Sequence, residues 1–156
     1  MISKKNRVTT IIELQAQELQ TYFNKLLEFK SNYAEFSSYI KPGMVLEIWR
    51  FLEYWIRTLC HCYDHSRVLD YSLKFTKDED SKNIYTYLKN LYEIRKVLVH
   101  TGGYVSDKKL QHFPKMEGMH LGSHNLIGFD NMFISESLKN AKSYLCTISN
   151  VTLKLK

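Results

Sequence analysis

Hydrophobic residues recur every three to four positions along most of this sequence, which is the spacing of an amphipathic helix. The pattern first holds over residues 9–40, which we predict to form one long helix with a bend near Ser31-Asn32. The KPG sequence at 41–43 is expected to end this helix, because proline cannot continue a helix and glycine loosens the turn.

The same pattern predicts three more helices after this break. The second covers about 44–69, and the third covers about 82–100 with Asp80 or Ser81 as its N-cap. The pair of glycines that follows position 101 should end the third helix, since glycine accepts the left-handed conformation of a helix C-terminus. A closing helix is predicted to begin near Ser135, its expected N-cap.

Residues 104–134 differ from the rest of the chain because turn residues are frequent there. Within them, HLGSHNLIGF predicts either a short β-hairpin or an irregular loop. The sequence contains no internal repeat, low-complexity tract or second-domain boundary. We therefore predict a single all-α domain over residues 1–156, an up-and-down bundle of four to five helices with a hairpin or irregular segment at about 104–134.

Composition and charge narrow the possible partners. The chain of 156 residues is 44% hydrophobic and carries a formal net charge of +6, which makes a polyanionic partner plausible. No run of about eighteen apolar residues predicts a membrane span, and the N-terminus lacks the apolar core of a signal peptide. The odd cysteine count, Cys60, Cys62 and Cys146, suggests reduced thiols, so we expect a cytoplasmic protein.

The CHCYDH sequence at 60–65 is one of two candidates for chemistry. On a helix, His61 and His65 can face one metal ion, and Cys60 or Asp64 can add a ligand. Cys60 and Cys62, however, lie about 200° apart on an ideal helix, and no second ligand pair completes a tetrahedral set. We therefore favour a helix end with polar and buried thiol residues and expect no metal or other cofactor, with a zinc site as the alternative.

The second candidate is EIRKVLVHTGG at 93–103, at the end of the third helix. Arg95 lies on that helix's hydrophobic stripe and points toward neighbouring helices, so its guanidinium needs an anion, a carbonyl or a water-filled cleft. His100 lies about 140° away, so the two meet only if the helix end relaxes or if two subunits pack their third helices together. From periodicity alone, we favour a simpler interpretation in which basic residues interact with the helix dipole, worth about 0.3–1 kcal/mol each.

The string E-x-R-K-x-x-x-H followed by T-G-G-Y-V resembles the signature of HEPN domains (higher eukaryotes and prokaryotes nucleotide-binding). The order of elements is also similar: two long helices, the motif helix, an irregular segment and a closing helix. The resemblance implies a metal-independent endoribonuclease without a cofactor, often a homodimer whose paired motifs form one cleft. Such proteins are frequent in toxin–antitoxin and antiphage systems, which makes an antitoxin or other partner protein possible.

The resemblance also implies roles for individual residues. Arg95 is expected to hold and stabilise the scissile phosphate and His100 to act as general acid or base, with Glu93 and Lys96 in support. Attack by the ribose 2′-hydroxyl then yields a 2′,3′-cyclic phosphate, so DNA should resist cleavage. For Tyr104, just beyond the glycines, we expect a place in the core, with an RNA contact as the alternative.

Lys96 departs from the family pattern, in which Asn, Asp or His more often follows the arginine. A lysine can contact phosphate, but it cannot accept a hydrogen bond that would orient His100. The alternative function is therefore a HEPN-like dimerisation module that binds nucleic acid or protein without catalysis.

Overall fold

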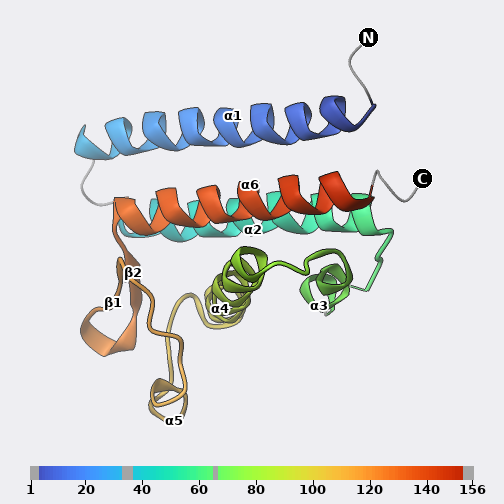
Figure 1. The fold of residues 1–156 in the computed structure, drawn as a ribbon. Helices are drawn as coiled ribbons and strands as arrows, with labels where there is room; N and C mark the ends of the chain where they lie inside the picture. The colour runs from blue at the N-terminus through green and yellow to red at the C-terminus, as the bar shows by residue number, and fades with distance from the viewer. Residues whose placement is uncertain (1–3, 33–36, 65–66, 153–156) are drawn as a thin grey trace.

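Four long helices form three layers in the computed structural model, which describes residues 4–32, 37–64 and 67–152 (Figure 1). Helix α1 lies over the pair formed by α2 and α6, and α4 runs across the other side of that pair. The bounds of the long helices in the described residues are α1 Lys4–Asn32, α2 Ser37–Cys60, α4 Glu79–Thr101 and α6 Asn131–Thr152.

Short elements complete the fold at two corners of the bundle. Their bounds are α3 Val68–Ser72, η2 Leu73–Phe75, α5 Asp107–Leu110, β1 Met119–Leu121, η3 Ser123–Asn125 and β2 Ile127–Phe129. The two strands pair antiparallel, with Leu121 opposite Ile127. The structure thus confirms an all-α helical bundle with a short hairpin inside 104–134.

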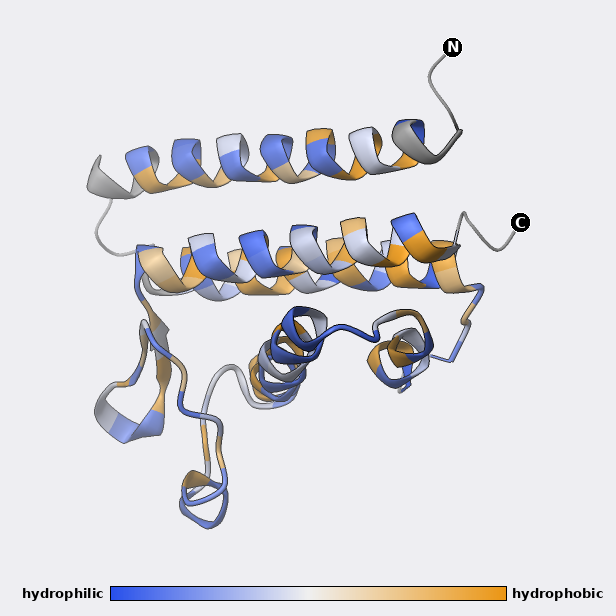
Figure 2. Cartoon of the chain, in the orientation of Figure 1, coloured by the Kyte–Doolittle hydropathy of each residue, from blue (hydrophilic) through white to orange (hydrophobic). Residues whose placement is uncertain are grey.

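The core lies where the helices face one another. Apolar residues of α1 gather on the side that faces α2 and α6 (Figure 2). In α4, the buried residues after the first turn are Leu88, Leu91, Ile94, Val97 and Leu98. The hydroxyl of the buried Tyr144 in α6 is hydrogen-bonded to the Ser72 hydroxyl, with 2.7 Å between the two oxygens. This bond connects α6 with α3.

The first two helices differ from their predicted bounds. Helix α1 ends at Asn32, where the bend was expected, and residues 33–36 lie outside the described part of the chain. The predicted break at KPG is wrong, because Pro42 lies inside α2. A proline within a helix costs about 3 kcal/mol. Met44 and Val45, which follow Gly43, are buried, and their burial offsets this cost by about 1.5–3 kcal/mol each.

The second helix is shorter than predicted, because α2 ends at Cys60 rather than near position 69. His61 has a φ of 52°, a left-handed conformation that cannot continue a right-handed helix. The chain therefore turns after Cys60, and Val68 and Leu69 are buried from the separate helix α3.

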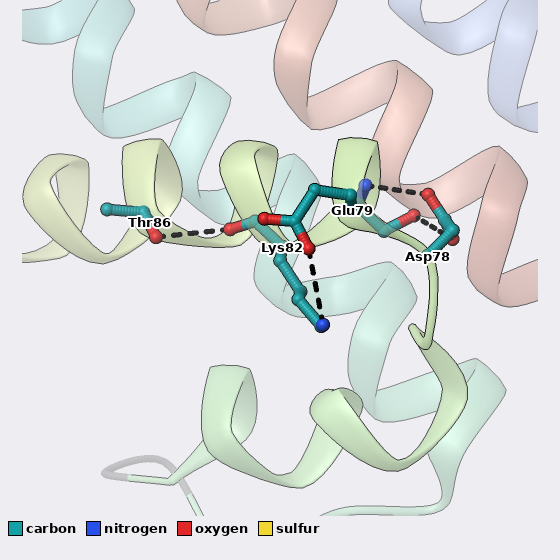
Figure 3. Close-up of polar contacts among 5 residues, drawn as sticks. Asp78, Glu79, Lys82 and Thr86 are labelled. Carbon is teal, nitrogen blue, oxygen red and sulfur yellow. Dashed lines mark hydrogen bonds and ion pairs between the residues drawn. The ribbon is translucent and has the colours of Figure 1, made fainter.

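The N-cap of α4 is Asp78, so the prediction of Asp80 or Ser81 is wrong (Figure 3). Asp78 Oδ1 accepts a hydrogen bond from the Ser81 backbone N–H at 2.8 Å, and its Oδ2 accepts one from the Ser81 hydroxyl at 2.6 Å. These hydrogen bonds favour the carboxylate and lower the pKa of Asp78. The helix thereby begins at Glu79, which forms an exposed ion pair with Lys82.

The closing helix α6 begins at Asn131, so the prediction that Ser135 caps it is also wrong. Asp130 Oδ1 instead accepts a hydrogen bond from the Phe133 backbone N–H at 2.7 Å. The earlier start buries Phe133 and Ile134 on the helix. None of the helices in the described ranges combines the length and apolar character that crossing a membrane requires.

Candidate nucleic-acid-binding cleft

The end of α4 is shaped by its two glycines, as the sequence predicts. Gly102 caps the helix with a φ of 60°, and its backbone N–H bonds to the Val97 carbonyl. The Gly103 N–H reaches the same carbonyl at 3.3 Å. Because α4 stays helical through Thr101, His100 remains on its solvent-exposed face.

The chain that leaves α4 is fastened to the hairpin. The Ile127 N–H donates to the Gly103 carbonyl at 3.0 Å, and the Val105 N–H donates to the Asn125 carbonyl at 3.0 Å. The hairpin is in turn anchored in the core, where Phe129 stacks on Phe133 of α6 with ring centroids 4.7 Å apart. The backbone beyond His100 is therefore tied to the core of the bundle.

The segment after Val105 is held by the same hairpin. Asn125 Nδ2 donates to Asp107 Oδ1 at 2.8 Å, which fixes the start of α5. The Ser106 carbonyl accepts from the Lys109 N–H at 2.8 Å, and the His112 N–H donates to the Lys109 carbonyl at 3.1 Å. These bonds place the basic side chains of this segment opposite the end of α4.

A cleft of about 480 Å³ opens between the second half of α4 and the segment 108–114. It is lined by Glu93, Lys96, Val97, His100, Thr101, Lys108, Lys109, His112, Phe113 and Pro114. Its charged side chains are three lysines and one glutamate, together with two exposed imidazoles. Such a lining attracts an anion, and the imidazoles can transfer protons at neutral pH.

Lys96 and Glu93 form an ion pair inside this cleft, with Lys96 Nζ 2.7 Å from Glu93 Oε2. Their side chains are 39% and 43% exposed, so the pair adds at most about 1 kcal/mol to stability. Lys96 Nζ also lies 5.2 Å from the centre of the Tyr92 ring. A pair this exposed leaves the lysine able to reach a bound anion.

The cleft contains three of the residues predicted as a site, Glu93, Lys96 and His100, but not Arg95. Arg95 is half-buried at the edge of the buried face of α4, and it makes no hydrogen bond or ion pair with any described residue. Since α4 is helical through Thr101, the separation of about 140° between Arg95 and His100 persists in the single chain.

Tyr104 lies outside the core. Its side chain is 44% exposed, so the expectation that it packs in the core is wrong. Its backbone forms an isolated bridge with Leu126, which keeps this segment beside the hairpin. The side chain is therefore accessible on the surface near the end of α4.

Three residues of the cleft, Lys108, Lys109 and His112, were missed by the sequence interpretation. The available signal was the basic run KKLQH at 108–112, which begins five residues after Gly103. That run has no helical periodicity that would align it with His100. It lies opposite α4 in the folded chain, where Asn125 near the hairpin is hydrogen-bonded to Asp107.

The helical ligand pair considered for a zinc site in CHCYDH would include His61, and His61 is not helical. Helix α2 ends at Cys60, His61 is left-handed, and His65 lies outside the described residues. Burial, with a smaller effect from Cys62, raises the pKa of the Cys60 thiol to about 12, so it stays protonated. Within the described ranges, no three His, Cys, Asp or Glu residues gather in a way that could hold a metal ion.

Comparison of the chain with protein-family models, curated proteins and solved structures finds no match.

Proposed function

We propose that this chain is a metal-independent endoribonuclease of the HEPN type that binds RNA in the cleft between α4 and the segment 108–114. The observation that carries this proposal is the placement of His100, exposed on a cleft whose charged lining is mostly lysine. RNA supplies the phosphate charge that such a lining attracts, and it supplies the 2′-hydroxyl that an imidazole can activate.

The proposed reaction is a transesterification within the RNA. The imidazole of His100 takes part in proton transfer while the 2′-oxygen attacks phosphorus and the bond from phosphorus to the 5′-oxygen breaks. The proton lost by the 2′-oxygen is matched by one gained by the 5′-oxygen, which leaves a 2′,3′-cyclic phosphate and a free 5′-hydroxyl. The ammonium groups of Lys96, Lys108 and Lys109 stabilise the added negative charge at phosphorus.

Lys96 fits this proposal despite its departure from the HEPN pattern. Its ammonium lies on the cleft wall that carries His100, where it can bind phosphate as a point charge. Glu93, 2.7 Å from Lys96 Nζ, pairs with that ammonium on the cleft wall when no phosphate is bound.

For Arg95, the HEPN resemblance supports binding of the scissile phosphate, and the geometry of α4 makes this role depend on a second copy of the chain. Within one chain, Arg95 does not line the cleft that contains His100, and the two residues lie about 140° apart around α4. We therefore include a homodimer in the proposal, in which Arg95 of one copy serves the cleft of the other. A cytoplasmic role as a toxin or antiphage effector, with an antitoxin as partner, belongs to the same proposal.

A second candidate function is binding of nucleic acid or protein without cleavage. One observation favours it: no side chain among the described residues donates or accepts a hydrogen bond that orients His100. A freely rotating imidazole is a poorer catalyst than one held by a neighbour.

The test incubates the purified protein with a single-stranded RNA oligonucleotide in excess EDTA, beside a DNA oligonucleotide of the same sequence. We expect RNA fragments with 2′,3′-cyclic phosphate ends by mass spectrometry, intact DNA, and no fragments from the His100→Gln protein. The control His120→Gln changes an exposed histidine of β1 outside the cleft and should cleave normally. Binding of RNA without cleavage supports the second candidate, and equal cleavage by His100→Gln contradicts the enzyme.

A further inference from the structure

A second imidazole shares the cleft with His100. His112 comes from the segment that follows α5, whereas His100 comes from the end of α4, so the two histidines reach the cleft from different elements. Both side chains are exposed. His112 is absent from the HEPN-like motif, and nothing in the helical pattern of the sequence connects it with His100.

The position of His112 is fixed by its neighbours in the chain. Its backbone N–H bonds to the Lys109 carbonyl at 3.1 Å, and Phe113 beside it packs against the hydrophobic core. The hydrogen bond from Asn125 to Asp107 holds the start of the same segment to the hairpin. His112 therefore does not sit on a free loop tip.

The charged groups that share the cleft with His112 come from both of its walls. Glu93 and Lys96 belong to α4, and Lys108 and Lys109 belong to α5. The lysines suit a bound phosphate, because an ammonium is a compact positive charge with several hydrogen-bond donors. Glu93 is paired with Lys96 at 2.7 Å, so among the described residues that line the cleft we assign proton transfer to the two imidazoles.

The proposed reaction needs two proton transfers at different places. One proton leaves the attacking 2′-oxygen, and another reaches the departing 5′-oxygen, which lies on the opposite side of phosphorus in an in-line displacement. A single imidazole on one wall is close to only one of these oxygens at a time. Two imidazoles that enter from different walls can serve both oxygens in the same step.

We propose that His112 is a second catalytic residue of this cleft and that His100 and His112 divide the acid and base roles, with an RNA phosphodiester as the ligand between them. This inference rests on the proposed function. One imidazole takes the proton from the 2′-hydroxyl as the bond from the 2′-oxygen to phosphorus forms. The other gives a proton to the 5′-oxygen as the bond from phosphorus to the 5′-oxygen breaks, so protons and charge balance without a cofactor.

The test compares two RNA substrates that differ in one atom. The first is ordinary, and in the second the departing 5′-oxygen is replaced by sulfur, which leaves as a thiolate without a proton from the enzyme. On ordinary RNA, His100→Gln and His112→Gln should each lower kcat by roughly 10²- to 10⁴-fold, while His120→Gln retains the full rate. On the sulfur substrate, one of the two variants should recover nearly the wild-type rate and the other should stay slow.

The recovered variant identifies the general acid and the slow one identifies the general base. The inference is overturned if His112→Gln cleaves ordinary RNA at the wild-type rate, or if the sulfur substrate restores both variants or neither. Thermal unfolding of each variant checks that the exposed substitutions leave the fold intact. A wild-type protein that cleaves neither substrate contradicts the proposed function itself, which separates that failure from the failure of the role of His112.

Discussion

The Asp78 side chain makes the stability of the protein depend on pH. Its hydrogen bonds from Ser81 hold its pKa below the ordinary value of 3.8. A carboxylate whose pKa is lowered by folding stabilises the protein fully above that ordinary value, and the contribution is lost as the pH falls through the folded pKa. We expect Asp78→Asn to melt at a lower temperature than wild type at pH 7. This difference in melting temperature should close below pH 3.8.

Circular dichroism melts at several pH values test this prediction. Asp80→Asn is the matched control, because it removes a charge from the same first turn without breaking the hydrogen bonds between Asp78 and Ser81. The control should shift the melting temperature less at pH 7. A gap for Asp78→Asn that stays constant from pH 7 to pH 3 contradicts the account.

Cap residues were the least predictable single positions in this chain. The sequence DEDS at 78–81 contains three residues that can cap a helix, and propensity alone does not separate them. The structure selects Asp78, whose carboxylate reaches both the N–H and the hydroxyl of Ser81. At the start of α6, Asp130 rather than Ser135 caps the helix, since the earlier start lets Phe133 join the core.

Helix α4 ends at a position that requires glycine. Gly102 has a φ of 60°, and a Cβ built there meets nothing within 4 Å, so a substitution is penalised by the backbone conformation alone. We expect Gly102→Ala to lower the free energy of unfolding by about 1–2 kcal/mol. Gly102→Asn should cost less, because asparagine tolerates the left-handed conformation better.

Urea denaturation of the two variants measures these costs. Both variants replace the same glycine with a residue that has a Cβ. The difference between their free energies of unfolding therefore reports the preference for the left-handed conformation. Equal stability of Gly102→Ala and wild type contradicts the left-handed cap.

The α5 segment supplies the charge of the second cleft wall. If Lys108 and Lys109 contact RNA phosphates, the double variant Lys108→Gln/Lys109→Gln should bind single-stranded RNA more weakly. The slope of log K against log salt should flatten by about 0.7 for each lost contact. The control pair Lys139→Gln/Lys142→Gln loses equal charge from a different groove, between α1 and α6.

Fluorescence anisotropy at several salt concentrations measures both slopes. The double variant in α5 should differ clearly from wild type, and the α6 pair should not. Equal flattening by the two pairs indicates that only net charge matters and contradicts a defined binding cleft.

The ends of helices could be predicted where the hydrophobic periodicity was strong. The prediction was wrong where burial in the folded protein outweighed a local sequence rule. The spacing of Leu88, Leu91 and Leu98 located α4 within three residues at its start and one at its end. Pro42 was expected to end a helix, yet it is accommodated inside α2 because the residues that follow are buried. Sequence patterns carry no measure of that tertiary gain.

At the scale of the molecule, the regular geometry of α4 places Arg95 and His100 on different faces, and of the two only His100 lines the cleft. If each active site combines Arg95 of one copy with His100 of the other, wild type should form a dimer of two 18.5 kDa chains. Arg95→Ala and His100→Gln should each be inactive alone. An exchanged mixture of the two should regain about a quarter of the wild-type rate, since half the dimers are mixed and each has one intact site.

Light scattering reports the dimer, and single-turnover cleavage in EDTA reports the complementation. A mixture that stays inactive although the subunits exchange contradicts a site shared between copies. In that outcome, Arg95 acts within its own chain or has no role in cleavage.

The overall architecture was predictable from hydrophobic periodicity, whereas the cleft was not. The order of the long helices followed from local pattern, and the pattern within 104–134 left a hairpin and an irregular segment as alternatives. The cleft depends on contacts distant in sequence, such as Asn125 with Asp107, which fold the chain back so that His112 shares a cleft with His100. No local pattern encodes that return.

The most direct test of the central claim is NMR of the histidine ring Cε1–H signals during titration with a 2′-O-methyl RNA oligonucleotide, which binds without being cleaved. Each ring is assigned by its His→Gln variant. The account predicts that the signals of His100 and His112 shift in a saturable manner while those of His120 and His124, outside the cleft, stay in place. Saturable binding that leaves His100 and His112 unmoved, or that moves the hairpin histidines instead, contradicts the assignment of RNA to this cleft.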